Sequence, residues 1–400
     1  MATAVEIFKA AVDLGCSDIH LKPGANPKAR INGNLVKLKQ FPILTPDDTK
    51  ALIYETMSSK NMAAFNQDGI YELDYSFDLP LIGRFRMNVF KTRNAMGLVA
   101  RLLHDAPQSL DELGTPPILK TLAMMKTGIV IVSGATGSGK STTLAGMIDY
   151  INKNKEVNII STEDPIEILH KDINSSISQR EIGSDVASFA SALKSALRQD
   201  PDVILIGEIR DLDIMRTVLV AADTGHLVIT TLHTTSAAET VNRIISLYPT
   251  NERHEIRRAL ASSLRGIVGQ KILPNTKGGR SIFNEVLLNT PAVAEIIIDE
   301  TKSAKDLDKI IVTHNEIGMQ SFDQALEKLF RSGTVTLDVA KEFAVDPKKF
   351  EGNLKNNIQK TSDNGTLSQH AQTQPSNITH MNPQERVDAL RKSAFPPRRA

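Results

Sequence analysis

The sequence predicts an α/β protein with two domains, in which an α+β domain precedes a larger domain built on a mostly parallel sheet. The length of 400 residues suits two or three domains. From about residue 118 onward, strand-like apolar runs alternate with helical patterns, as in parallel sheets covered by helices. One of these strands leads directly into a glycine-rich phosphate-binding pattern and then into a helix.

Residues 1–105 form the predicted α+β domain. Helical periodicity extends over residues 4–14, and Asn32-Gly33 is a hairpin turn between two strand-like segments. Later segments alternate polar and apolar residues, as half-buried strands do. The predicted strands are 18–21, 29–31, 35–38, 71–77, 84–90 and 98–103. Residues 106–117 contain three prolines and are predicted to be an interdomain linker.

The second domain is predicted to cover residues 118–350. Its predicted strands are 128–133, 157–162, 203–207 and 226–232, and its predicted helices are 186–199, 236–246 and 250–273. The last helix is predicted from an apolar stripe at helical spacing that includes Ile256, Leu260 and Leu264. The rest of this domain is predicted to be mostly helical.

Residues 351–400 are predicted to form a disordered tail. Asn, Gln, Ser and Thr dominate this segment, and its single aromatic residue is Phe395. A short helix over 383–393 is a further possibility. The basic end, 395–400, could dock on an acidic partner, but a solvated terminus is the favoured interpretation.

The composition argues against several classes of function. Lys and Arg number 47 against 46 Asp and Glu, so no global signature of nucleic-acid or anionic-membrane binding is present. The single cysteine, Cys16, cannot form an intramolecular disulfide, and the N-terminal residues lack the pattern of a signal peptide. No apolar run approaches the ~20 residues that cross a bilayer. We expect a cytoplasmic protein that meets a membrane only through partners.

The most specific motif is G-A-T-G-S-G-K-S, which matches the phosphate-binding pattern G-x-x-x-x-G-K-[ST]. In this pattern backbone N–H groups surround a phosphate, the lysine reaches its β and γ oxygens, and the last hydroxyl ligates Mg²⁺. A chance glycine-rich turn is a poor alternative, because a strand precedes this loop and a helix follows it. The predicted ligands of ATP are Gly134, Ala135, Thr136, Gly137, Ser138, Gly139, Lys140, Ser141 and Thr142. Ser141 is also the predicted Mg²⁺ ligand.

Hydrolysis further requires a group that positions water. Glu208 follows the apolar strand 203–207, whose carboxyl end is expected beside the phosphate loop, and it is the first candidate for the catalytic base. Glu163 follows another predicted strand and offers a second carboxylate at the same edge, with Asp164 and Glu167 nearby. A charged residue that merely caps a strand is the alternative for each.

Two histidines and two arginines are weaker candidates by pattern alone. His226 and His233 bracket a strand, and seven residues of strand span roughly 23 Å, so a shared metal ion is not expected. A packed structural histidine is the commoner case. Arg86 and Arg101 lie on separate predicted strands, and their guanidinium groups suit bidentate phosphate contacts, although surface arginines are commoner.

Four ordered segments together resemble the secretion-ATPase superfamily of type II and type IV machines. They are 134–141, 162–167, 197–211 and 224–234, flanked by Ser17-Asp-Ile-His-Leu21 near the start and by 317–326 near the end. Within the superfamily, residues 1–345 are similar to the PilT/PilU-type type IV pilus retraction ATPases. The resemblance implies a PAS-like N-terminal domain, a RecA-like ATPase domain and a homohexameric ring.

The resemblance also implies roles for the weaker candidates. Glu163 and Glu208 match the acidic residues of the Asp box and the Walker B segment, in which Gly207 is a common residue. His226 and His233 match the His box. Arg86 and Arg101 match first-domain arginines that reach nucleotide phosphate in relatives. The implied activity is ATP hydrolysis that powers pilin depolymerisation and twitching motility.

The implied partners are an inner-membrane pilus platform protein and a PilT-like ATPase, at the inner face of the cytoplasmic membrane. PilT proteins carry an A-I-R-N-L-I-R-E box, whereas Ala294 and Ile298 replace both arginines here, which favours a PilU-like protein. Two alternatives stay open. One is an assembly or secretion ATPase, disfavoured by the single cysteine and the short first domain, and the other is a non-autonomous ring subunit that assists a PilT-like motor.

Overall fold

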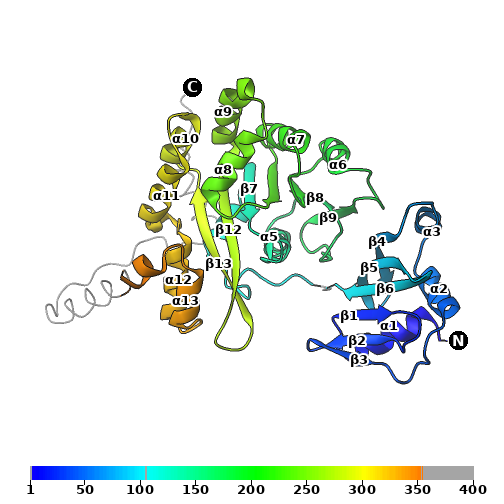
Figure 1. Cartoon of the computed structure of the whole chain (residues 1–400). Coiled ribbons are helices and arrows are strands. Elements are labelled where there is room, and N and C mark those ends of the chain that lie inside the picture. Colours follow the sequence, from blue (N-terminus) through cyan, green and yellow to red (C-terminus); the bar gives the residue numbers. More distant parts are fainter. Residues whose placement is uncertain (1, 104–105, 353, 355–400) are drawn as a thin grey trace. The chain divides into compact units, whose positions relative to one another are not determined.

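The computed structural model describes residues 2–103, 106–352 and 354 (Figure 1). The chain divides into two compact units. The first comprises Met1–Pro107 and Asp164–His170, and the second comprises Gln108–Glu163 and Lys171–Ala400. The predicted tail, with its possible helix over 383–393, lies outside the described residues apart from 351, 352 and 354.

The first unit contains the predicted α+β domain, residues 1–105, together with Asp164–His170, which the prediction places in the second domain. Its six-stranded antiparallel sheet has the order β3-β2-β1-β6-β5-β4. The strands are β1 (Asp18–Leu21), β2 (Lys28–Ile31), β3 (Asn34–Lys37), β4 (Glu72–Leu79), β5 (Gly83–Thr92) and β6 (Ala95–Leu102). The helices are α1 (Ala4–Asp13), α2 (Pro46–Glu55) and α3 (Ser59–Phe65). Side chains of β5 alternate between buried and more exposed positions, so the two faces of the sheet differ.

One face of this sheet packs against the helices. The fully buried ring of Phe8 on α1 meets that of Phe85 on β5 edge to face, with centroids 4.8 Å apart. A capping box between Thr3 and Glu6 satisfies the first N–H groups of α1 and fixes where this helix begins. The opposite face carries the arginines discussed below.

The second unit is built on a seven-stranded sheet of order β13-β12-β7-β11-β10-β8-β9, parallel except for the pair β12–β13. The strands are β7 (Gly128–Ser133), β8 (Asn158–Glu163), β9 (Ser176–Glu181), β10 (Val203–Ile206), β11 (Leu227–Leu232), β12 (Leu264–Pro274) and β13 (Arg280–Leu288). Every residue of β7, β10 and β11 is buried, as expected for central strands covered on both faces. The predicted mostly parallel sheet is therefore confirmed.

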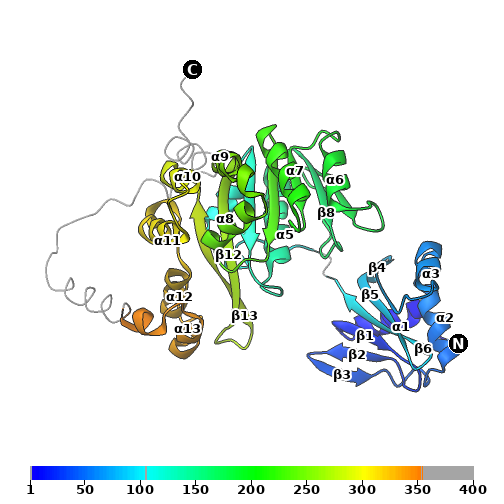
Figure 2. The ribbon, with the colours of Figure 1, turned by 45° about the horizontal axis from the view of Figure 1, so that its top comes forward.

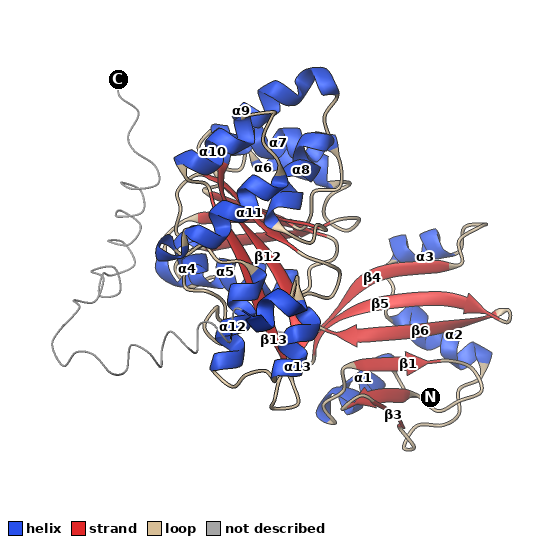
Figure 3. Cartoon of the chain, turned by 60° about the vertical axis from the view of Figure 1, so that its left-hand side comes forward, coloured by secondary structure: helices blue, strands red, loops and turns tan. Residues whose placement is uncertain are grey.

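Ten α-helices of the described residues belong to this unit. They are α4 (Ile118–Ala123), α5 (Lys140–Asn154), α6 (Phe189–Ala196), α7 (Leu212–Asp223), α8 (Ala237–Ser246), α9 (Arg253–Ser263), α10 (Pro291–Ile298), α11 (Ala304–Thr313), α12 (Phe322–Arg331) and α13 (Leu337–Phe343). Figure 2 shows α12 and α13 beside the long strands β12 and β13, and Figure 3 shows how helices surround the sheet. Within the described part of the chain, none of the helices has the length and apolar character needed to cross a bilayer.

The prediction of a single helix over 250–273 is wrong. Helix α9 ends at Ser263, and Leu264 begins β12, which lies between β7 and β13. The helical stripe ends where distant strands supply backbone partners, and local spacing cannot reveal such pairing. Gly266 also suits a strand here, because a Cβ on it would lie 3.1 Å from the Leu287 carbonyl oxygen. The mostly helical C-terminal part is confirmed after β13, a strand that the sequence did not predict.

Candidate active site

The phosphate loop joins β7 to α5 in the second unit. Gly134 has a φ of 155° and Gly137 a φ of 81°, conformations that favour glycine. A Cβ on Gly134 would lie 2.4 Å from the Gln270 carbonyl oxygen, so only glycine fits there. Gly139 caps α5 in the left-handed region and provides no side-chain acceptor. The first N–H groups of α5 therefore lack the side-chain cap that Thr3 provides to α1, as a phosphate-binding helix terminus requires.

Lys140 crosses the inside of this loop. Its Nζ donates to the carbonyl oxygens of Gly134 at 2.8 Å and of Ala135 at 3.0 Å, and the residue is 8% exposed. Ala135, Thr136, Gly137 and Ser141 are exposed around it, Thr142 and Gly139 are half-buried, and Ser138 is buried. An ammonium group at a helix N-terminus, ringed by exposed loop backbone, fits the β- and γ-phosphates of a nucleotide.

Glu208 and His233 meet at the same edge of the sheet. Glu208 lies two residues beyond β10 and His233 directly after β11, and these parallel strands are neighbours. The Nε2 of His233 lies 2.7 Å from the Oε2 of Glu208, and its Nδ1 lies 3.5 Å from the Nζ of Lys140. Because an ammonium group can only donate, Nδ1 accepts and Nε2 carries the proton that Glu208 accepts. The three side chains form one continuous array.

The carboxylate of Glu208 is kept ionised. Partial burial raises its pKa, but hydrogen bonds from Arg210 and His233 outweigh burial, so the pKa of Glu208 is lowered overall. Arg210 donates through Nε to Glu208 and stacks over the ring of Phe189, with its guanidinium carbon 5.3 Å from the ring centroid. A carboxylate held in this way can orient a water molecule and accept its proton.

Glu163 ends β8, the neighbour of β10 on the side away from β11. Its Oε1 accepts hydrogen bonds from Ser161 Oγ at 2.8 Å and from Gln179 Nε2 at 3.1 Å. The Gly207 N–H donates to the Thr162 carbonyl at 2.8 Å, which extends the pairing of the two strands toward Glu163 and Glu208. Glu163 and Glu208 therefore both lie at the carboxyl edge of the same sheet.

His226 lies elsewhere. It precedes β11, whereas His233 follows it, so the six-residue strand separates them. The Nδ1 of His226 lies 2.9 Å from the Ala221 carbonyl and 3.1 Å from Thr224 Oγ1, at the C-terminal end of α7. The structure thus brings His233, but not His226, to the phosphate loop, and these contacts resemble those of a structural histidine.

Arg86 and Arg101 lie directly opposite each other on β5 and β6 of the first unit. Opposed residues of antiparallel strands project from the same face, so the two guanidinium groups share the exposed face of the sheet. Asp18 on β1 opposes Arg101 from the other side, and its Oδ1 accepts from Arg101 Nε at 2.9 Å. The Asp18 side chain is 9% exposed and that of Arg101 is 67% exposed. Asp18 holds one nitrogen of the group and leaves its outer nitrogens accessible.

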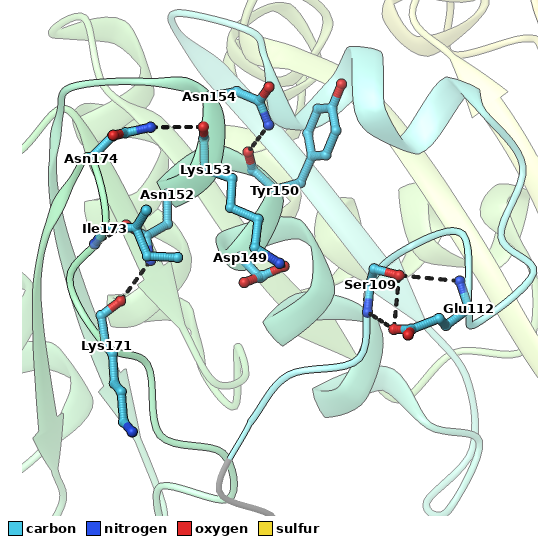
Figure 4. A network of polar contacts seen from close by, with 10 residues as sticks. All are labelled: Ser109, Glu112, Asp149, Tyr150, Asn152, Lys153, Asn154, Lys171, Ile173 and Asn174. Atoms are coloured by element: carbon cyan, nitrogen blue, oxygen red, sulfur yellow. Dashed lines mark hydrogen bonds and ion pairs between the residues drawn. The ribbon is translucent and has the colours of Figure 1, made fainter.

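The base of the loop helix is fixed by a polar network (Figure 4). The side chain of Asn152, 1% exposed, donates to the Lys171 carbonyl at 2.8 Å and accepts from the Ile173 N–H at 3.0 Å. Asn174 Nδ2 donates to the Lys153 carbonyl at 2.8 Å. These bonds fasten the C-terminal end of α5 to the segment before β9, which keeps the opposite end of the helix in place beneath the loop.

Sequence reasoning missed several residues that support the site. The sequence pattern assigns no role to Arg210, two residues after Glu208, or to Asp18 in the segment 17–21. Gln179 supports Glu163 from β9, a strand without a clear sequence pattern. The contacts of Asp18 and Gln179 depend on strand pairing, which local spacing does not reveal.

The family that matches the sequence is described as Type II/IV secretion system protein, and the match covers residues 3–327. The chain belongs to this family, in its PilT/PilU-type group. The type IV pilus retraction ATPase PilT of Pseudomonas aeruginosa is 38% identical over 345 residues, covering 86% of this chain and 99% of that protein. The type IV pilus ATPase PilU of the same organism is 39% identical over 336 residues, covering 84% of this chain and 87% of that protein.

A solved structure supports the same group. The crystal structure of the pilus retraction motor PilT with bound ADP has a TM-score of 0.81 and 43% identity, and the match covers 88% of this chain and 99% of that one. This secretion ATPase of the PilT/PilU type is therefore an ATP-hydrolysing enzyme with the α/β architecture that the sequence predicts.

Proposed function

We propose that this chain is the subunit of an ATP-driven motor that retracts type IV pili by removing pilins from the base of the fibre. The observation that carries the proposal is the array of Lys140, His233 and Glu208 beside the phosphate loop. Such an array provides a charge for the γ-phosphate and an ionised carboxylate for the attacking water. Its occurrence in a chain of the PilT/PilU-type group connects hydrolysis to pilus retraction.

The hydrolytic step follows from these positions. The N–H groups of the loop and the Lys140 ammonium hold the β- and γ-phosphates of ATP. Glu208 orients a water molecule and accepts its proton as the oxygen bonds to the γ-phosphorus, and the bond to the β-phosphate oxygen breaks to leave ADP. His233 holds Glu208 in place. Glu163 is proposed as the second carboxylate at this edge.

Mg²⁺ fits the first turn of α5. The Ser141 hydroxyl is exposed beside the buried Lys140, where it can reach the metal ion that accompanies ATP. When bound, Mg²⁺ neutralises charge on the β and γ oxygens. Ser141 would hold the ion together with phosphate oxygens of the nucleotide and water molecules.

The mechanical step is proposed to be closure of the first domain over the nucleotide. In this proposal, Arg86 and Arg101 reach the phosphates when residues 1–105 close on residues 118–350, and residues 106–117 form the hinge. Nucleotide must bind the closed and open arrangements unequally, or no movement can be driven. The accessible guanidinium of Arg101 supports this role.

We further propose a homohexameric ring in the cytoplasm, at the inner face of the cytoplasmic membrane. Sequential closure around the ring would turn an inner-membrane platform protein. The near-neutral net charge of +1 favours contact with the membrane through such a partner rather than through lipid directly.

A second candidate is a PilU-like subunit that assists a PilT-like ATPase. Identities of 38% to PilT and 39% to PilU do not separate the two. Ala294 and Ile298 on α10 favour the PilU-like case, because both arginines of the A-I-R-N-L-I-R-E box are missing there. An assembly ATPase is disfavoured, because the chain covers 99% of the retraction ATPase PilT.

The test is genetic. Deletion of the gene is expected to give hyperpiliated cells or to abolish twitching, whereas bald cells would support an assembly ATPase. Retraction is then measured with this chain alone and beside a catalytically inactive PilT-like partner. Retraction by the chain alone identifies an autonomous motor, and retraction only with the inactive partner identifies the accessory role.

A further inference from the structure

Gln270 on β12 is a buried amide beneath the phosphate loop. It is 0% exposed, and its side chain bonds Ser138, Thr143 and Asn284, which all belong to the second unit. Its Nε2 donates to the Ser138 carbonyl at 2.8 Å, and its Oε1 accepts from Thr143 Oγ1 at 2.8 Å and from Asn284 Nδ2 at 3.1 Å. One side chain thus joins the loop, the helix α5 and the strand β13.

The backbone of Gln270 touches the other end of the loop. A Cβ on Gly134 would lie 2.4 Å from its carbonyl oxygen, and a Cβ on Gly139 would lie 3.1 Å from its Nε2. Gln270 therefore forms the floor beneath both the first and the last glycine of the loop. Larger residues at either position would displace it.

The bond to Ser138 fixes the direction of one peptide group. In a trans peptide the C=O and the following N–H point in opposite directions. Because the Ser138 carbonyl points down to Gln270, the Gly139 N–H points away from this floor, toward the inside of the loop. A phosphate is recognised by N–H groups that point inward in this way.

We propose that Gln270 is a positioning residue that holds the Ser138–Gly139 peptide in the orientation needed for phosphate binding. It acts through the loop backbone and does not touch the nucleotide. The inference rests on the proposed nucleotide site and adds a residue to it from a strand outside the recognised motifs.

The orientation of the amide is itself determined by its neighbours. The Asn284 side chain, 1% exposed, donates to Oε1, so Nε2 must face the Ser138 carbonyl. The backbone carbonyl of Asn284 accepts from Gln320 Nε2 at 2.8 Å, and Gln320 Oε1 accepts from Lys328 Nζ at 2.7 Å. Gln320 therefore ties the backbone of β13 to α12 and makes no hydrogen bond to the amide of Gln270 or to the Asn284 side chain that orients it.

The test compares Gln270→Glu with the matched control Gln320→Met in the full-length protein. The glutamate keeps an acceptor for Thr143 and Asn284 but places an oxygen against the Ser138 carbonyl. Gln320→Met also removes a buried amide from the second unit, but one that bonds the Asn284 backbone and leaves the contacts of Gln270 intact. Binding of ADP, the Km and kcat for ATP, and thermal unfolding are measured for each variant.

Gln270→Glu is expected to weaken ADP binding and raise the Km by about tenfold or more, with a smaller change in kcat. Gln320→Met is expected to stay within about twofold of wild type in affinity. Thr143→Val, which removes one donor to Gln270, is expected to weaken ADP binding by about threefold and serves if Gln270→Glu does not fold.

The proposal is overturned if Gln270→Glu, or Thr143→Val in its place, binds ADP like wild type. It is equally overturned if Gln320→Met loses as much affinity, since the effect would then reflect general loosening. Failure of the wild-type chain to bind ADP would overturn the nucleotide site as well, whereas the preceding outcomes leave that site intact.

Discussion

The Nε2 of His233 lies 2.7 Å from the Oε2 of Glu208, at the ends of neighbouring parallel strands. The other ring nitrogen of His233 faces Lys140 at 3.5 Å. The histidine therefore links Lys140, the proposed ligand of the γ-phosphate, to Glu208, the proposed catalytic base. Its neutral form, with the proton on Nε2, satisfies both neighbours at once.

Replacement of His233 should affect turnover more than binding. We expect His233→Ala to lower kcat by about 10- to 100-fold, because Glu208 loses the donor that orients it. ADP affinity should change much less. His226→Ala is the matched comparison at the other end of β11, and steady-state ATPase assays should find its kcat within about threefold of wild type. Equal losses in the two variants would contradict the geometry.

Arg210 should set the acidic limit of activity. Its hydrogen bond is the leading contact that lowers the pKa of Glu208 against the opposing effect of burial. A base works only when it is deprotonated, so activity falls as pH drops through this pKa. In Arg210→Gln the pKa of Glu208 rises, and the acidic limb of the profile of kcat/Km against pH should move to higher pH. An unmoved limb would show that Arg210 does not control the base.

Asp18 should act through Arg101. Partial burial raises the pKa of Asp18, but hydrogen bonds from Arg101 and Ser17 and nearby positive charge lower it overall. Because its folded pKa is lowered, the carboxylate stabilises the fold above its unfolded pKa, and this stability is lost as pH falls through the folded pKa. Asp18→Asn should therefore cost about 1–3 kcal/mol at pH 7 and progressively less in acid.

The same variant tests the proposed role of Arg101 in catalysis. Asp18→Asn weakens the contact that holds the Arg101 guanidinium group, which should lower kcat/Km for ATP by about tenfold. Asp78→Asn is the control, because Asp78 pairs with Arg84 at 2.9 Å on the same sheet but is 60% exposed. Its effect on stability should be below about 1 kcal/mol. Unfolding and ATPase measurements that find the two variants alike would refute the positioning role of Asp18.

Glu285 should make stability fall as pH rises toward neutrality. Burial raises the pKa of Glu285 from 4.5 to about 7; the Ala237 N–H and Lys271 lower it, and Asp308 and Asp323 raise it. The folded state thus holds a proton that the unfolded state releases between about pH 4.3 and 7, so the free energy of unfolding decreases over this interval. Above pH 7 this contribution is constant.

Glu285→Gln removes this titration. The glutamine keeps an oxygen that can accept from the Ala237 N–H, whose nitrogen lies 2.6 Å from Glu285 Oε2. Relative to wild type, the variant should gain on the order of 2 kcal/mol in stability between pH 5 and pH 8.5. Chemical denaturation at both pH values measures this difference. A difference that does not depend on pH would rule out titration of Glu285.

Strong local patterns explain which parts of the fold could be predicted. The apolar run of β7, the glycines of the phosphate loop and the helical spacing of α5 are encoded within about 25 consecutive residues. The apolar run of β10 likewise predicts that Glu208, which follows it, lies at the carboxyl edge of the sheet. The site built on these neighbouring strands could therefore be proposed from the sequence.

Long-range pairing explains what could not be predicted. Residues 264–274 have an apolar pattern that continues the periodicity of α9, and only β7 and β13 make them a strand. The contact of Gln270 with Ser138 joins residues separated by 132 positions. The opposition of Arg86 and Arg101 likewise follows from the register of β5 and β6, which periodicity alone does not fix.

The most direct test of the account is the rate of ATP hydrolysis by Glu208→Gln. The glutamine keeps the size of the side chain but cannot accept a proton from water, so kcat should fall by about 10²- to 10⁴-fold while ADP still binds. A Glu208→Gln protein that hydrolyses ATP at the wild-type rate would contradict the assignment of Glu208 as the catalytic base.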